Sequence, residues 1–147
     1  MWMIKRLKNL GANVTDLKDV FEKQVRSCLE FGVPVWQSGL TAMEKRDIER
    51  VQKSFCKIAL GEKYQSYSEA LETLLLESLE SRRIDLCLKF AIKAEKSEKF
   101  KHWFKPNLKT IGTRLKPTKY VPVHANHARF ERSPLSYLTD LLNEFYC

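Results

Sequence analysis

The sequence predicts an all-α protein in which a small helical bundle precedes a basic, proline-containing extended arm and an amphipathic C-terminal helix. Apolar residues recur three and four positions apart in several segments, and most of these segments begin at a residue that commonly caps a helix. No segment shows the strict apolar and polar alternation that is typical of a half-buried strand. We therefore expect a bundle over residues 1–95, an arm over 96–132 and a docking helix over 133–147.

Two helices are predicted at the start of the chain. The first covers residues 2–10 and stops at Gly11, since glycine is common just after the last residue of a helix. Thr15 is placed to cap a second helix over about 16–31, whose apolar residues recur at core spacing. The sequence "GVPVW" then predicts an extended turn, because Pro34 has no backbone N–H and disfavours helical geometry in the residue before it.

The helix with the clearest limits is predicted over residues 42–60. Thr41 and Glu44 have the spacing of a capping box, in which each side chain accepts a hydrogen bond from the backbone N–H of the other residue. Gly61 follows the last residue with helical periodicity and is expected to end the helix. One side of this helix is apolar and is expected to face the core.

Two further helices complete the predicted bundle. Ser66 and Glu69 repeat the capping-box spacing ahead of a short helix near residues 67–75. Ser78 is placed to cap a longer helix over about 79–95. Both segments have apolar residues at intervals of three and four, which predicts that one face of each packs in the bundle.

The composition changes between residues 96 and 132. This segment contains ten Lys or Arg against two Asp or Glu, several prolines and little helical periodicity. These features favour an extended basic arm over another helix. Ser133 and Pro134 then have the pattern of a helix cap followed by proline in the first turn, which predicts the last helix.

A basic stripe is predicted on the helix at residues 42–60. Its members are four cations at helical spacing: Arg46, Arg50, Lys53 and Lys57. At about 100° per residue they lie within about 60° of one another, on the side away from the apolar residues. The chain has a net charge of +8, and such a stripe suits a phosphate backbone. A solvated basic face has the same composition, so the residues alone leave both interpretations open.

The cysteines indicate a reduced, intracellular protein. All four are widely spaced, without a C-x-x-C pair. Most fall within predicted helices, where a buried thiol acts as a small apolar group. No apolar run is long enough to span a membrane, and the first ten residues lack the apolar core of a secretory signal. We therefore expect no disulfide framework and no membrane partner.

The sequence contains no recognisable catalytic constellation. A glycine-rich phosphate loop and a nucleophile motif are both missing, so we expect no enzyme activity in this chain by itself, no cofactor and no small-molecule substrate. His124 and His127 form an H-x-x-H in the arm, with His102 upstream. Because no cysteine pair accompanies them, we expect exposed loop histidines rather than a zinc or other metal site. Trp36 and Trp103 are expected to pack in turns rather than to stack on bases.

Five blocks of the sequence resemble one protein family in their order and spacing. The blocks are "RLKNLG", "VRSCLEFGVPVWQSGLT", "IERVQKSFCKIALGEKYQSYSEAL", "SLESRRIDLCLKFA" and "RSPLSYLTDLLN". Together they resemble the region after the polymerase palm in reverse transcriptases of jockey-like non-LTR (LINE-type) retrotransposons. In that family R-P-x-L-E-Y-x-x-P-V-W precedes E-R-V-Q-K and an L-G-x-x-Y turn, and S-L-x-x-R-R precedes S-P-I-P-Y-L-T-x-L-L-N. The match covers nearly the whole chain.

The resemblance implies a thumb-like and C-terminal region that lacks the polymerase palm. The family holds two metal ions on paired aspartates for nucleotidyl transfer, and this chain contains no Asp-Asp. Met1 is expected to lie where the palm of the family has already ended. The resemblance therefore implies a non-catalytic fragment that grips an RNA or DNA template–primer duplex. It adds Arg82 and Arg83 to the nucleic-acid-binding residues, with an ion pair inside the bundle as the alternative role for one of them.

Two functional hypotheses follow. The first is a nucleic-acid-binding fragment of an RNA-directed DNA polymerase, which uses the basic stripe and the arm. The second is a helical protein-interaction module with no nucleic-acid role, in which the apolar last helix needs a partner surface such as a polymerase palm.

Overall fold

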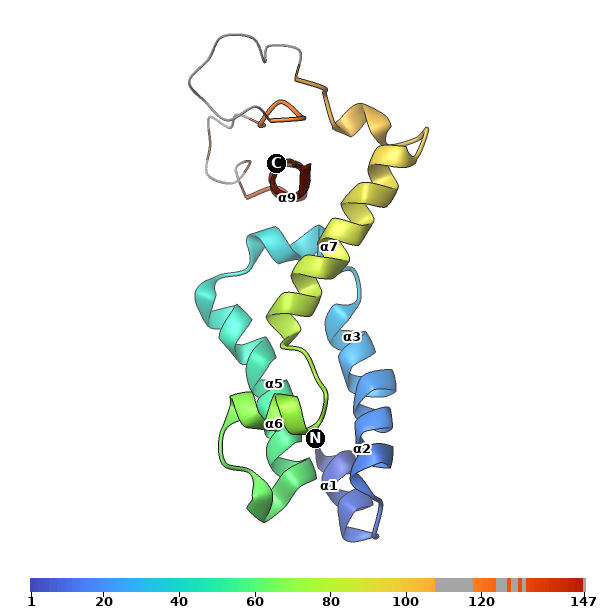
Figure 1. The fold of residues 1–147 in the computed structure, drawn as a ribbon, viewed down its shortest axis with the longest axis vertical. Coiled ribbons are helices and arrows are strands. Elements are labelled where there is room, and N and C mark those ends of the chain that lie inside the picture. Colours follow the sequence, from blue (N-terminus) through green and yellow to red (C-terminus); the bar gives the residue numbers. More distant parts are fainter. Residues whose placement is uncertain (108–117, 124–126, 128–129, 131, 147) are drawn as a thin grey trace. The chain divides into compact units, whose positions relative to one another are not determined.

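The computed structural model describes residues 1–107, 118–123, 127, 130 and 132–146 (Figure 1). The all-α fold is confirmed: in these ranges the sole pairing of strand type is an isolated antiparallel bridge between Pro106 and Tyr120. The helices form two compact units, Met1–Phe31 with Leu40–Arg82 and Gly32–Gly39 with Arg83–Cys147. The boundary between the units falls inside a helix, whereas the sequence prediction ends the bundle at residue 95.

The first unit consists of short helices around one long helix. Its elements are α1 (Trp2–Asn9), α2 (Val14–Val20), the π-helical turn η1 (Phe21–Arg26), α3 (Ser27–Glu30), α5 (Ala42–Leu60), the 3-10 turn η3 (Gly61–Lys63), α6 (Tyr67–Thr73) and the first residues of α7 (Leu79–Lys96). In Figure 1, α2 and α3 form one continuous column, because the π-helical turn joins them without leaving the helical region.

Most of the predicted helix limits in this unit are confirmed. Thr41 and Glu44 form both halves of a capping box at the start of α5. Gly61 follows α5 with a φ of +60°, a backbone conformation that favours glycine. At the next two helix starts, the hydroxyl oxygen of Ser66 accepts from the backbone N–H of Glu69, and Ser78 accepts from the residue three positions on.

Two local predictions were wrong. The side chain that caps α2 is Asn13 rather than Thr15, so the helix begins at Val14. "GVPVW" is not an extended turn, because Val33–Trp36 forms the short helix α4. Pro34 is compatible with helical geometry there, since it lies in the first turn, where a backbone N–H has no partner inside the helix.

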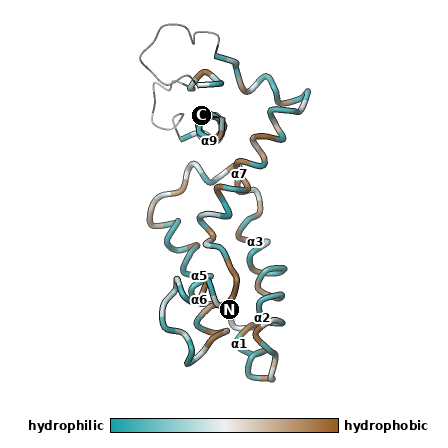
Figure 2. The backbone as a smooth tube through the Cα atoms, in the orientation of Figure 1, coloured by the Kyte–Doolittle hydropathy of each residue, from teal (hydrophilic) through white to brown (hydrophobic). Residues whose placement is uncertain are grey.

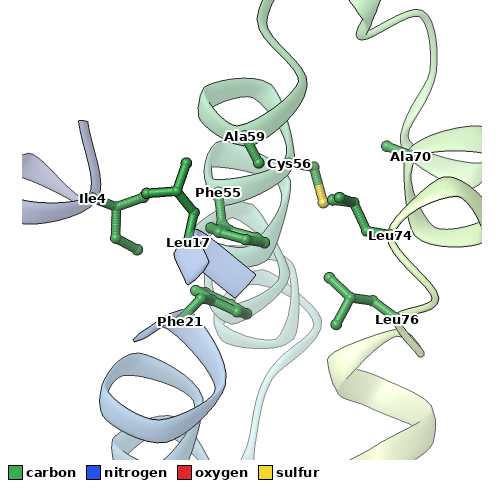
Figure 3. Close-up of a cluster of buried hydrophobic side chains, with 9 residues drawn as sticks. All are labelled: Ile4, Leu17, Phe21, Phe55, Cys56, Ala59, Ala70, Leu74 and Leu76. Carbon is green, nitrogen blue, oxygen red and sulfur yellow. The ribbon is translucent and has the colours of Figure 1, made fainter. Parts of the chain in front are cut away.

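The core of the first unit is built on two stacked phenylalanines. The rings of Phe21 and Phe55 lie 4.2 Å apart between centroids and are nearly parallel. In Figure 3 they face each other, with Ile4 on one side and Leu74 on the other. The buried apolar residues of this core are Ile4, Leu17, Phe21, Phe55, Cys56, Ala59, Ala70, Leu74 and Leu76. Segments far apart in the sequence are therefore joined through α5.

The second unit contains α4, the 3-10 turn η2 (Gln37–Gly39), most of α7, the 3-10 turn η4 (Lys101–Trp103) and α9 (Pro134–Tyr146). Its buried apolar residues are Val33, Cys87, Ala91, Ala94, Phe104, Tyr120, Leu138 and Leu142. The predicted C-terminal helix is confirmed, with the Ser133 hydroxyl oxygen accepting from the backbone N–H of Ser136 at 3.4 Å. This helix contacts α4 and η2, and its Leu138 and Leu142 lie in the buried apolar cluster of this unit.

Hydrophilic positions interrupt the long helices, as Figure 2 shows for α5 and α7. Among the described residues, no helix combines the length and the apolar composition that are needed to cross a bilayer.

The predicted extended arm falls partly on residues 108–117, 124–126, 128–129 and 131, which lie outside the described ranges.

Phe55→Ala tests the stacked core. Loss of a fully buried ring that packs on Phe21 is expected to lower the free energy of unfolding by about 3–5 kcal/mol. Urea unfolding followed by far-UV circular dichroism measures the change. Met43→Ala is the matched control on the same helix, since Met43 is exposed and its truncation is expected to cost less than about 0.5 kcal/mol. Equal effects of the two changes would contradict this core.

Candidate nucleic-acid interface

The four cations of the predicted stripe are all exposed on α5. Arg46, Arg50, Lys53 and Lys57 lie along one side of this 19-residue helix. The buried residues of α5 lie on the other side, and they are Gln52, Phe55, Cys56 and Ala59. The structure therefore gives α5 an inner apolar face and an outer basic face, as the helical spacing predicts.

The stripe cations differ in their local contacts. Arg46 donates from Nε to a backbone carbonyl oxygen one turn earlier at 3.2 Å. Arg50 pairs with Asp47 at 2.6 Å, and both side chains are more than half exposed. The Lys57 ammonium lies 5.6 Å from the centre of the Tyr64 ring. These contacts are within the helix or at its end, and each leaves N–H donors of the cation unused.

The inner side of the same "ERVQK" segment has a different role, which the sequence analysis missed. Glu49 accepts hydrogen bonds from the backbone N–H groups of Leu79 at 3.1 Å and Glu80 at 3.2 Å, and from the Tyr67 hydroxyl. A carboxylate at a helix N-terminus satisfies N–H groups that have no partner inside the helix. Glu49 therefore fixes the start of α7 within the first unit.

Gln52 extends this polar network. Its Nε2 donates to the Glu77 carbonyl oxygen at 2.7 Å and to the Tyr67 hydroxyl oxygen at 3.1 Å. Burial and the hydrogen bond to Glu49 raise the pKa of Tyr67 above its ordinary value, so the hydroxyl stays protonated as a donor. Helical spacing was the signal for this role in the sequence. Glu49 and Gln52 lie at intervals of three and four residues in line with the buried residues of α5.

Arg82 and Arg83 are placed differently from the stripe. Arg82 makes a two-point ion pair with Glu30, at 2.6 Å from Nε and 3.1 Å from Nη2. The hydrogen bond to Glu30 raises the pKa of Arg82. Arg83 is 1% exposed, and its Nε donates to Gln37 at 3.0 Å. Its two terminal nitrogens have no hydrogen-bond partner among the residues that the structure describes. Arg82 thus has the alternative role of an ion pair within the bundle, and Arg83 does not present its charge to solvent.

Lys119, in the predicted arm, is bound internally as well. Its ammonium donates to Glu95 at 2.7 Å and lies 3.4 Å from the centre of the Tyr146 ring. Glu95 also accepts hydrogen bonds from the hydroxyls of Tyr146, at 2.8 Å, and of Tyr120. This described part of the arm is therefore tied to α7 and α9 of the second unit.

The Glu95 cluster sets the charge state of its members. Burial by itself would raise the pKa of Glu95, but the hydrogen bonds from Lys119, Tyr120 and Tyr146 lower it below its ordinary value of 4.5. The hydrogen bond to Glu95 raises the pKa of Lys119. Burial, with the same carboxylate, raises the pKa of Tyr120 to about 12. At neutral pH the cluster therefore holds the Glu95 carboxylate, the Lys119 ammonium and the protonated hydroxyl of Tyr120.

The remaining candidate residues do not assemble into a site. Among the described residues, no three His, Cys, Asp or Glu side chains are grouped to hold a metal ion. His102 packs edge-on against Trp103, and His124 lies outside the described ranges. Burial raises the pKa of Cys56 and Cys87 to about 11, so both are protonated thiols at neutral pH.

No protein-family model, curated protein or solved structure matches this chain. The resemblance to the retrotransposon polymerases consequently has the five sequence blocks as its basis. The stripe on α5 is the set of aligned, exposed cations that the sequence predicted.

Glu95→Gln tests the cluster through its pH dependence. A carboxylate with a lowered folded pKa stabilises the fold above its unfolded pKa, and this contribution is lost as pH falls through the folded value. We expect the variant to be less stable than the parent by about 1.5–3 kcal/mol at neutral pH. The difference is expected to shrink below about pH 4.5. Thermal unfolding at a series of pH values measures it.

Glu98→Gln is the matched control for that experiment. Glu98 belongs to the same unit, and its side chain is 86% exposed in a surface pair with Lys101. Exposed pairs of this kind contribute little to stability. The control is expected to follow the parent at every pH, and a Glu95→Gln profile parallel to the parent would contradict the role of the cluster.

Proposed function

We propose that this chain is a non-catalytic nucleic-acid-binding module, related to the thumb and C-terminal part of a retrotransposon reverse transcriptase. In this proposal it grips a template–primer duplex through the basic stripe of α5. The observation in its favour is the alignment of four exposed cations, from Arg46 to Lys57, opposite the buried face of one helix.

The dimensions of the stripe suit a nucleic-acid backbone. Arg46 and Lys57 are eleven residues apart, which is about 16 Å along a helix. One strand of a duplex presents a phosphate about every 3.4 Å along its axis, so a row of phosphates lies within reach of the stripe. Contacts of this type position a protein on the backbone and do not distinguish between sequences.

The ion pair between Arg50 and Asp47 is the main contact that competes with a phosphate. Both side chains are solvent-exposed, at 75% and 53%, and such pairs contribute about 0–1 kcal/mol. A phosphate that accepts two hydrogen bonds from the guanidinium is a stronger partner than an exposed carboxylate. Asp47 therefore partly neutralises Arg50 in the free protein. The pair is weak enough for a phosphate to replace the carboxylate.

The proposal includes a polymerase palm as partner and an intracellular location. The palm follows from the resemblance, and the intracellular location follows from the four widely spaced cysteines.

A specific observation favours a second candidate function, a helical protein-interaction module without a nucleic-acid role. The second unit contains an apolar hollow of about 400 Å³, whose lining includes Val35, Trp103, Phe130 and Leu135. Val35 is 71% exposed, which is high for an apolar residue beside a hollow. An apolar side chain of a partner protein fits such a surface.

The purified chain is expected to have no polymerase activity of its own. Two-metal nucleotidyl transfer needs acidic ligands that converge on one site, and the paired aspartates of the family are missing from the sequence. A primer-extension assay with Mg²⁺ or Mn²⁺ measures this. Extension that EDTA abolishes would contradict the proposal that the module is non-catalytic.

The double variant Arg50→Gln with Lys53→Gln tests the stripe. Each phosphate contact releases counterions, so log K falls with log salt by about 0.9 per contact on a duplex. We expect the variant to reduce that slope by about two and to weaken binding to all duplex sequences alike. Fluorescence anisotropy with a labelled duplex over a range of salt concentrations measures the slope.

Removal of one exposed positive charge outside the stripe provides the control. Lys89→Gln changes an exposed lysine outside α5 that pairs with Asp85 at 2.6 Å, and the slope is expected to stay unchanged. If the double variant binds duplex with the parent's affinity and slope, the stripe is a solvated face. Loss of binding to a partner protein on Val35→Asp, with duplex binding intact in all variants, would favour the second candidate.

A further inference from the structure

The exposed face of α1 combines aromatic and basic residues. Trp2, Lys5, Arg6 and Asn9 recur at the spacing of one helix face, and all four are exposed. Ile4 lies in the core on the other side. Trp2 is 72% exposed, and the Arg6 guanidinium lies 5.2 Å from the centre of its ring. Packing within the described part of the chain does not account for this tryptophan.

A basic hollow lies between α1 and the end of α5. It has a volume of about 340 Å³ and is lined by Lys5, Lys8, Asn9, Lys57 and Ile58. Three lysines thus line one space, and the lining includes no carboxylate. Lys57 is also the last member of the α5 stripe, so the hollow continues the basic surface onto a second helix.

Lys8 holds the two sides of the hollow together. Its ammonium donates to the Ile58 carbonyl oxygen at 2.6 Å, close to the residues that end α5. The C-terminal end of a helix carries partial negative charge, which favours a cation at this place. Two N–H donors of Lys8 are left for another acceptor, since an ammonium has three.

We propose that this hollow is a subsite for single-stranded nucleic acid. Lys5 and Lys57 bind a backbone phosphate in it, and Trp2 stacks on a neighbouring base. The proposal rests on the proposed function and extends it, because it adds an unpaired strand next to the duplex that the stripe binds.

Electrostatics explain why an anion belongs in the hollow. Three like charges that line one space repel one another, and a phosphate between them replaces repulsion with attraction.

The tryptophan points to a single strand rather than a duplex. Bases inside a duplex are already stacked, whereas an unpaired base has a face that can stack on an aromatic side chain. Arg6 lies over one face of the Trp2 ring, which leaves the other face for a base. Trp2 and Lys5 are one turn of helix apart, about 5 Å along the axis, so a base and a nearby phosphate can be bound together.

The test compares two probes on the full chain by fluorescence anisotropy. One is an oligothymidylate of about 12 nucleotides, within the range of single-strand site sizes, and the other is a blunt duplex of the same length. Trp2→Ala is expected to weaken oligothymidylate binding about 5- to 150-fold. Lys5→Gln is expected to reduce the salt slope for oligothymidylate by about 0.7. Both variants are expected to bind the duplex within twofold of the parent.

Lys23→Gln is the matched control, with circular dichroism to verify folding of each variant. Lys23 belongs to the same unit, is 70% exposed and does not line the hollow. This variant is expected to bind both probes as the parent does.

The remaining outcomes separate the subsite from the stripe. If Trp2→Ala and Lys5→Gln bind oligothymidylate like the parent, the subsite is overturned, and the stripe is judged separately by Arg50→Gln with Lys53→Gln on the duplex. If the α1 variants weaken both probes equally, the assignment to a single strand is overturned. If they weaken oligothymidylate alone while the stripe variant binds duplex normally, the subsite is supported and the proposed duplex grip fails.

Discussion

The hydrogen bonds that the Glu49 carboxylate accepts hold α5, α6 and α7 of the first unit together. The first N–H groups of α7 have no partner inside that helix, and Glu49 accepts from two of them and from the Tyr67 hydroxyl. A single side chain of α5 thus fixes where α7 begins and how α6 is held. Because α5 is positioned from its inner side, its outer residues are under no packing constraint. That separation allows one short segment, "ERVQK", to hold the fold with Glu49 and Gln52 and to expose Arg50 and Lys53.

The second unit also contains a polar network that joins separate segments of the chain. This network includes a lysine of the basic segment, so it bears on how the basic composition is interpreted. Asn143 of α9 accepts from the backbone N–H of Tyr120 at 2.8 Å and donates to its carbonyl oxygen at 3.1 Å. Glu95 then binds the hydroxyl of the same tyrosine and the ammonium of Lys119. A lysine from the most basic stretch of the sequence is therefore a structural residue. Net charge in a segment therefore does not by itself predict a binding surface.

The helix limits were predictable because caps are local signals. Thr41, Gly61 and Ser133 each act where the sequence placed them. Asn13 and Thr15 are both caps two residues apart, and α2 begins after Asn13, the residue type that ranks higher as a cap. The exposed stripe followed from helical spacing. The partners of Glu49 could not be found that way, since they lie 18, 30 and 31 positions further along the chain.

The distribution of carboxylates decides which cations are available to a phosphate. Four lysines and arginines on η1, α7 and η4 have acidic partners within 4 Å, and they are Lys23, Arg26, Lys89 and Lys101. The segment Trp2–Asn9 contains three cations and no acidic residue, so nothing within α1 neutralises it. Lys8 anchors this helix to the carbonyl end of α5. The backbones of α1 and α5 that carry Lys5 and Lys57 are consequently held together, and such preorganisation would lower the entropic cost of the proposed binding. A basic surface held in this way is better suited to a phosphate than a larger number of mobile lysines.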